Sequence, residues 1–384
     1  MRSAETYFKS WFGRFEAVHY RRPDPWLWLP AAALIGFGLL MVLNTTYFLG
    51  LEKTGDAFHF FKLHVAHIAA GLIVMVMLSQ FSIVGLRRLV TPLALVSVVM
   101  LLAVYIPGLG LVRGGARRWL RIGPIVLEPS ELVKFALIFF LADFLARRQD
   151  RLRDFMRGPA PAFAIVGALA VILLKQPDFG STVMISVILF AMLWAAGAEI
   201  KHLGAAGALA AAGLAVQMFT KSYRMRRLTA FLDPWQVARG AGFQLIQSFI
   251  ALGAGGLRGV GLGAGRQKMF YLPQSHTDFI FAVVGEEFGI VGACLVIGLF
   301  CVILFRGMRI AHDEPDPFAS LLAVGLTALL SLQALINMAV VIGMIPTKGL
   351  PLPFLSYGGT AIMMAMAAVG ALLALGRRPA VRAE

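Results

Sequence analysis

The segment Ile290–Phe305 reads IVGACLVIGLFCVILF, a run without a single charged residue. Similar apolar runs occur at Leu29–Leu43 and at Leu93–Tyr105. A helix of about 20 apolar residues crosses the hydrocarbon core of a bilayer. Because lipid offers no hydrogen-bond partners, the backbone of such a run is expected to be helical. The run therefore predicts a membrane-spanning helix, and its recurrence predicts a chain made of many such helices.

The composition of the whole chain agrees with this interpretation. Of its 384 residues, 59% are hydrophobic and only 14% are charged, whereas about a quarter of a soluble domain is charged. We therefore predict an all-α polytopic membrane protein with about ten spans. The spans are expected at 26–49, 60–79, 90–107, 129–146, 161–175, 180–197, 202–219, 278–305, 317–343 and 358–376.

These spans form one predicted membrane domain, 26–376, between two tails, 1–25 and 377–384. Its largest outside segment is 220–277, between the seventh and eighth spans. Aromatic residues recur at helical spacing in the first tail and predict a short interfacial helix; they are Phe8, Trp11, Phe12 and Phe15. No cleavable signal is expected, because this tail is polar and aromatic and the first long apolar run has spanning length.

The distribution of basic residues predicts the orientation in the membrane. Arg87, Arg147 and Arg306 lie in plain charged loops beside span ends, as cytoplasmic anchors do. An even number of spans then places both termini in the cytoplasm. Against this bias, the outside segments also hold Arg113, Arg117, Arg118, Arg121, Lys221, Arg224, Arg226, Arg227, Arg239, Arg258, Arg266 and Lys268. Positive charge kept outside indicates an anionic ligand, although lipid headgroups explain it equally well.

Three arginines lie close together at Arg117, Arg118 and Arg121, with Trp119 among them. Guanidinium groups bind phosphate oxygens through two parallel hydrogen bonds, and the indole ring is able to lie against a sugar. The alternative for Trp119 is an anchor at the membrane interface. The stretch therefore predicts either contacts with a phosphorylated sugar or an interfacial loop.

Charged residues also occur at the ends of predicted spans, where they are costly and usually functional. Glu131 and Lys134 are three residues apart at the start of the fourth span, so they share one helical face. They are either a self-satisfied ion pair or part of a site. Asp178, in the string QPDFGST before the sixth span, is either a helix cap or a functional carboxylate.

A glycine-rich stretch, GAGGLRGVGLGAGR, occupies Gly253–Arg266 and contains Arg258. No strand precedes it, and its spacing differs from that of a dinucleotide-binding loop. Either its backbone N–H groups hold a pyrophosphate or it is a flexible loop. Before this stretch, Asp233-Pro234-Trp235 predicts a cap and then a helix to about Ala251.

The string LPQSHTDFIF, Leu272–Phe281, is followed closely by Glu286 and Glu287. Asp278 lies at the outer end of the eighth span, where partial desolvation raises the pKa of a carboxyl group and suits it to act as a base. On a straight helix Glu286 lies about 12 Å deeper than Asp278 and about 80° around from it. Glu287 then lies on the opposite face. We expect Lys134 to pair with Asp278 or Glu286.

Three prolines interrupt the string PTKGLPLPFLSYGG, Pro346–Gly359, before the tenth span. Proline lacks an N–H group and disrupts helices, so a rigid irregular turn is predicted. Lys348 within the string adds another outside cation.

Four of these strings, taken in order along the chain, resemble the SEDS family, which includes FtsW, RodA and SpoVE. They are GARRWLRIGP with EPSELVK, QPDFGST, LPQSHTDFIFAVVGEE, and PTKGLPLPFLSYGG. The resemblance extends from about Trp28 to Leu375 and includes the ten-span layout. The strings TKGLP and GEE are most similar to the division branch, FtsW. Thr360-Ala361 departs from the Ser pair that is common after SYGG.

The resemblance implies a peptidoglycan glycosyltransferase that polymerises lipid II at the periplasmic face of the bacterial inner membrane. A sugar hydroxyl attacks the anomeric carbon of the growing chain, and undecaprenyl pyrophosphate leaves. Asp278 is the implied base. The implied substrate-binding residues are Arg117, Arg118, Trp119, Glu131, Lys134, Arg258, His276 and Lys348, and the implied supports are Asp178, Glu286 and Glu287.

The leaving pyrophosphate needs positive charge or a divalent cation such as Mg²⁺ or Mn²⁺. The resemblance implies a class B penicillin-binding protein transpeptidase and other division proteins at the septum as partners, and no nucleic acid. The alternatives are a RodA-like elongation polymerase and a lipid II flippase. A flippase should also carry binding groups deep in the membrane or on the cytoplasmic side, whereas these motifs gather at the outer face.

Overall fold

The computed structural model describes residues 23–377 except 114, 124, 220–228 and 241. The predicted interfacial helix of the N-terminal tail and the C-terminal residues 378–384 therefore lie outside the described residues. So do four of the outside cations, Lys221, Arg224, Arg226 and Arg227.

Each predicted span corresponds to a helix in the described part of the chain. The helices are α2 (Pro25–Thr54), α3 (His59–Ser79), α4 (Ile83–Arg88) with α5 (Val90–Ala103), α6 (Pro129–Ala146), α7 (Pro159–Lys175), α8 (Phe179–Ala195), α9 (Ile200–Phe219), α12 (Ile280–Asp313), α13 (Pro317–Val341) and α14 (Gly359–Leu375). Of these, α2, α3, α4 with α5, α12 and α13 are long and apolar enough to cross a membrane. The predicted polytopic helical class is confirmed.

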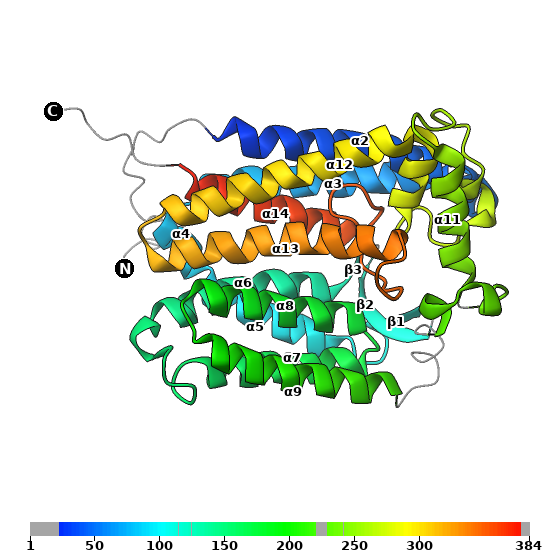
Figure 1. The fold of residues 1–384 in the computed structure, drawn as a ribbon. Coiled ribbons are helices and arrows are strands. Elements are labelled where there is room, and N and C mark those ends of the chain that lie inside the picture. The colour runs from blue at the N-terminus through cyan, green and yellow to red at the C-terminus, as the bar shows by residue number, and fades with distance from the viewer. Residues whose placement is uncertain (1–22, 114, 124, 220–228, 241, 378–384) are drawn as a thin grey trace.

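The helices run side by side in one bundle with α13 near its centre (Figure 1). α13 contacts α12 and α14 as well as α6 and α8, and it therefore joins two groups of helices. α3 packs against α14, and α5 packs against α6. Most of α13 is buried, whereas α3 exposes much of its apolar surface. This contrast fits a helix bundle whose outer members face lipid.

The two ends of the described chain lie at the same end of the bundle. α2 begins with Pro25 at its first position, and Asp24 Oδ1 accepts a hydrogen bond from Trp26 N–H (3.0 Å). Such a cap satisfies an amide group that lacks a partner within the helix. α2 begins and α14 ends at one end of the bundle, and a small sheet and α11 (Phe243–Gly255) lie at the other (Figure 1).

The loop 108–128 contains this small antiparallel sheet, which was not predicted from the sequence. Its strands are β1 (Gly110–Arg113), β2 (Ala116–Ile122) and β3 (Ile125–Leu127), paired in the order β1-β2-β3. Two-residue connections that contain glycine join the strands, and these are typical of β-hairpins. The prediction for this loop treated its arginines as phosphate-binding residues and left out the glycines that indicate turns between strands.

The helix predicted from Trp235 to Ala251 is wrong in its first half. Asp233 does cap a turn, since its Oδ1 accepts from Trp235 N–H (3.1 Å), but only a 3₁₀ turn, η2 (Trp235–Val237), follows. Gly240 and Gly242 come next in the chain, and glycine in a helix costs about 1 kcal/mol relative to alanine. The helix α11 therefore begins only after the second glycine.

The eighth span is not one straight helix that starts at Asp278. α12 begins at Ile280, after Asp278, and Gly289 breaks it with φ 65° and ψ −159°. Only glycine adopts this conformation readily. The segment after α11 bridges the break, because Ile290 N–H donates to the Gly256 carbonyl (3.0 Å). The expected angular relation between Asp278 and Glu286, which assumed one straight helix, is therefore wrong.

Gly38 on α2 offers a test of how tightly the outer loops pack. A Cβ at this position would collide with the carbonyl oxygen of Phe354, and overpacking typically costs about 1–3 kcal/mol. We expect Gly38→Ala to lower the thermal unfolding temperature of the detergent-purified protein. Gly36→Ala is the matched control, since nothing lies within 4 Å of its added Cβ. Equal unfolding temperatures for the two variants would contradict the packing described here.

Candidate functional site

The backbone of residues 274–279, here called the Asp278 segment, is held by neighbouring elements. Ser356 Oγ donates to the Thr277 carbonyl (2.7 Å), Tyr357 N–H donates to the His276 carbonyl (2.8 Å), and Asn337 Nδ2 donates to the Asp278 carbonyl (2.8 Å). Two of these donors belong to residues 346–358, here called the proline-rich loop, and the third belongs to α13. Asp278 therefore has a fixed backbone although it precedes its helix.

The carboxylate of Asp278 faces the proline-rich loop. Its Oδ2 lies 3.2 Å from the position that a Cβ would take on Gly349. The preceding residue, Lys348, has its Nζ 5.4 Å from the centre of the Phe179 ring, at the start of α8. Burial lowers the pKa of the Lys348 amino group. The fold thus places the carboxylate of Asp278, the predicted base, beside Gly349, the residue that follows the partly buried Lys348.

Lys134 is connected to this loop through Gln333. Its fully buried Nζ lies 2.7 Å from Glu131 Oε1 and donates to Gln333 Oε1 (3.0 Å). Gln333 Nε2 in turn donates to the Pro351 carbonyl (2.9 Å). The expectation that Lys134 pairs with Asp278 or Glu286 is wrong, because the nearer Glu131 is its partner. The pair Glu131–Lys134 is both self-satisfied and connected to the proline-rich loop.

Arg118, Trp119 and Asp178 form a neighbouring cluster. Asp178 Oδ1 caps α8 by accepting from Ser181 N–H (3.0 Å) and also lies 3.8 Å from an Arg118 nitrogen. The Arg118 guanidinium lies 5.0 Å from the centre of the Trp119 ring. Asp178 is thus a cap, as one alternative proposed, and an anchor for an arginine. Its neighbour Phe179 contacts Lys348, so the two clusters adjoin.

Glu128, to which the sequence analysis gave no role, joins these groups at the start of α6. Burial, together with the carboxylates of Glu131 and Asp178, raises the pKa of Glu128 to about 8. Its backbone N–H donates to Thr360 Oγ1 (2.9 Å). The threonine that departs from the family pattern therefore ties the start of α14 to the start of α6.

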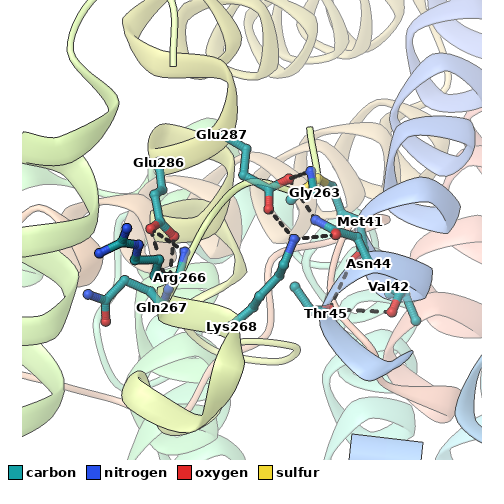
Figure 2. A network of polar contacts seen from close by, with 10 residues as sticks. All are labelled: Met41, Val42, Asn44, Thr45, Gly263, Arg266, Gln267, Lys268, Glu286 and Glu287. Carbon is teal, nitrogen blue, oxygen red and sulfur yellow. Dashed lines mark hydrogen bonds and ion pairs between the residues drawn. The ribbon is translucent and has the colours of Figure 1, made fainter. Parts of the chain in front are cut away.

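A second network lies on α12, where Lys268, Glu287 and Asn44 each bond to the other two (Figure 2). Lys268 Nζ contacts Glu287 Oε1 (2.7 Å) and Asn44 Oδ1 (2.6 Å), and Asn44 Nδ2 donates to Glu287 Oε2 (2.6 Å). The side chains of Lys268 and Glu287 are almost fully buried. This triad joins α2, α12 and the chain that leads to the Asp278 segment.

The glycine-rich stretch surrounds the two glutamates of α12 (Figure 2). Gly263 N–H donates to Glu287 Oε2 (3.1 Å), and Arg266 N–H donates to Glu286 Oε1 (2.8 Å). Gln267 N–H also contacts the Glu286 carboxylate (3.3 Å). These amides therefore bind the protein's own carboxylates, and they are not the pyrophosphate cradle that one alternative proposed.

Two of the implied substrate-binding arginines are exposed. Arg117 is exposed on β2, and it lies on the other face from Arg118 because neighbours in a strand alternate. Arg258 is exposed between α11 and the break in α12.

The buried and partly buried amide side chains of this region were not predicted from the sequence. Asn337 and Gln333 lie one helical turn apart on α13, and Asn44 lies on α2. Each bonds to a segment that carries a predicted site residue. A signal was present, because polar residues within apolar spans are costly and usually functional. Only the charged residues were considered under that rule.

The matches to known proteins cover nearly the whole chain. The family model FTSW_RODA_SPOVE, described as Cell cycle protein, matches residues 25–379. A probable peptidoglycan glycosyltransferase FtsW of Geobacter sp. (strain M18) is 42% identical over 348 residues, which are 91% of this chain and 95% of that protein. Stage V sporulation protein E of Bacillus subtilis (strain 168) is 40% identical over 356 residues, 92% of this chain and 97% of that protein.

A solved structure also resembles this fold. It is described as "Structural coordination of polymerization and crosslinking by a peptidoglycan synthase complex". The similarity has a TM-score of 0.74 and 28% sequence identity, and it covers 92% of this chain and 97% of that chain.

Removal of the Lys268 charge is expected to destabilise the protein strongly. Lys268→Met leaves Glu287 buried without its cation, and breaking a buried ion pair typically costs about 3–5 kcal/mol. We expect a clear fall in thermal unfolding temperature in detergent. Arg258→Met is the control, because it removes an exposed cation from the same stretch. The triad would lose its assigned role if both variants unfolded at the wild-type temperature.

The lowered pKa of His276 predicts a specific pH dependence of the stability of the folded state. Burial, with a smaller effect of the Lys53 charge, lowers the pKa of His276 from 6.5 to about 4. As the pH falls from 6.5 to about 4, the unfolded chain takes up a proton that the folded chain does not. The stability of the folded state therefore decreases over this range. In His276→Gln the decrease measured by thermal unfolding should be smaller, and an unchanged decrease would refute this origin.

Proposed function

The chain belongs to the FtsW, RodA and SpoVE family of cell-cycle proteins, and on that premise we propose that it polymerises lipid II into glycan strands. The observation that carries the proposal is the position of Asp278. The backbone of the Asp278 segment is held by two other elements, and the Asp278 carboxylate faces Gly349, the residue after Lys348. A positioned carboxylate that faces a loop carrying a lysine suits a reaction that removes a proton from one substrate and releases an anion from the other.

In the proposed reaction Asp278 accepts the proton of the attacking sugar hydroxyl. The new bond forms between that oxygen and the anomeric carbon, while the bond from this carbon to the pyrophosphate oxygen breaks. The electron pair leaves with undecaprenyl pyrophosphate. Lys348 is the cation nearest in sequence to the Asp278 contact, and its partly buried position strengthens its attraction for an anion. Arg118, which lies 3.8 Å from Asp178, is the next candidate for the pyrophosphate.

A division role and an orientation in the membrane belong to the same proposal. A relative that is 42% identical is named FtsW, which supports division over elongation. The Asp278 segment and the sheet lie at the end of the bundle opposite to the start of α2 and the end of α14 (Figure 1). This arrangement supports a site on the face opposite to the chain ends; we propose that the site is periplasmic and the chain ends cytoplasmic, in a bacterial inner membrane at the septum. A class B penicillin-binding protein is the proposed partner, because the similar solved structure is described as coordinating polymerisation and crosslinking.

The residues that the structure describes include no group of three or more His, Cys, Asp or Glu placed to hold a metal ion. We therefore assign no protein ligands to Mg²⁺ or Mn²⁺ and derive no step through them. A requirement for either ion stays a prediction, and it is tested by adding a chelator to the polymerisation assay.

The decisive test is polymerisation of labelled lipid II by the protein with its transpeptidase partner, which is blocked by a β-lactam. We expect polymer from the wild type and at least about a 100-fold loss in Asp278→Asn, which keeps the shape of the side chain but removes the base. Asp56→Asn is the matched control, because Asp56 is exposed and pairs only with the exposed Lys62 in the described structure. A wild type that binds lipid II without making polymer would refute the proposal and favour a flippase.

A further inference from the structure

The Asp278 segment and the proline-rich loop meet at one buried side chain. Asn337, near the C-terminal end of α13, is 2% exposed. Its Nδ2 donates to the Asp278 carbonyl (2.8 Å) and to the Leu350 carbonyl (2.7 Å). An amide nitrogen carries two hydrogens, so each segment receives one of the two available donors.

The surroundings of Asn337 determine how its amide is oriented. Both neighbours are carbonyl oxygens, which only accept, so the nitrogen must face them. Oδ1 is then left buried without a hydrogen bond from the described residues. An unpaired buried acceptor typically costs about 1–3 kcal/mol. The chain tolerates this cost at a place where two N–H donors are needed together.

Other contacts do not replace this one. Gln333, one turn earlier on α13, donates to the Pro351 carbonyl (2.9 Å) and so reaches the proline-rich loop alone. Ser356 Oγ donates to the Thr277 carbonyl from within that loop. Among the described hydrogen bonds, that of Asn337 connects the backbone of Asp278 itself to the helix at the centre of the bundle.

From this geometry we propose that Asn337 is a positioning residue for glycosyl transfer, which sets the place of the Asp278 carboxylate relative to Gly349 and Lys348. The inference rests on the proposed function. Asp278 precedes Ile280, the first residue of α12, and Asn337 supplies its carbonyl with a donor from another helix. A misplacement of about 1 Å at a reacting group costs roughly 100-fold in rate.

The experiment compares Asn337→Leu and Asn337→Asp in the lipid II polymerisation assay. Leucine has a similar size and no donor, and an aspartate carboxylate has the same shape but repels the two carbonyl oxygens. We expect kcat to fall about 100-fold with KM for lipid II unchanged, because the base is displaced while the substrate contacts remain. Thr327→Val is the matched control, since Thr327 is fully buried on α13 and its hydroxyl has no hydrogen bond from the described residues.

A second measurement does not depend on activity. The Tyr357 N–H donates to the His276 carbonyl (2.8 Å) and reports whether the two segments stay together. In Asn337→Leu we expect faster hydrogen exchange of peptides that contain Tyr357 and the Asp278 segment, with no change in Thr327→Val. If Asn337→Leu does not fold, Asn337→Ser, which keeps one donor, takes its place and should show intermediate effects.

The outcomes separate this inference from the proposed function. A wild type without polymerase activity refutes the function, and the exchange measurement still judges whether Asn337 joins the two segments. Wild-type kcat together with wild-type exchange in a folded Asn337→Leu overturns the inference. A raised KM with unchanged kcat also overturns it, because the side chain would then bind substrate instead of placing the base.

Discussion

Most of the proline-rich loop from Leu350 to Ser356 is buried against the helix bundle, and two of its carbonyl groups receive hydrogen bonds from side chains of α13. Prolines remove N–H groups from the loop and prevent a regular ladder, yet buried carbonyls still need donors. Gln333 and Asn337 supply donors to the consecutive carbonyls of Pro351 and Leu350. The loop in turn holds the Asp278 segment through Ser356 and Tyr357. The geometry of the site therefore depends on two amide side chains of α13.

The same constraint explains the second network. Where Gly289 interrupts α12, the ordinary helical hydrogen bonds are lost and the glycine-rich stretch replaces them. Backbone N–H groups of this stretch also need acceptors. The Glu287 carboxylate accepts the hydrogen bond of Gly263 N–H, and the Glu286 carboxylate accepts that of Arg266 N–H. Lys268 and Asn44 then balance the charge and polarity that the glutamates bring into the bundle. One set of contacts thus replaces the backbone hydrogen bonds lost at Gly289 and provides partners for the buried carboxylates.

Much of the fold was predictable because bilayer spans are long, apolar and necessarily helical. Local contacts were predictable too, since the partners of the Glu131–Lys134 pair and of the Asp178 cap lie within a few residues. Contacts across the bundle were not. Lys134 meets Gln333 at a separation of 199 residues, and Lys268 meets Asn44 at 224. Periodicity says nothing about such distant partners, and the helix assumed to include Asp278 begins only at Ile280.

The central place of α13 has a mechanical consequence. This helix contacts both groups of spans, and near one end it holds the backbone of Asp278. Helices adjust to bilayer thickness by tilting, at a cost of fractions of a kcal/mol per Å of mismatch. A tilt of α13 relative to its neighbours would move the point from which the carboxylate is suspended. Under the proposed function, the thickness of the surrounding bilayer would thereby be coupled to the geometry of glycosyl transfer.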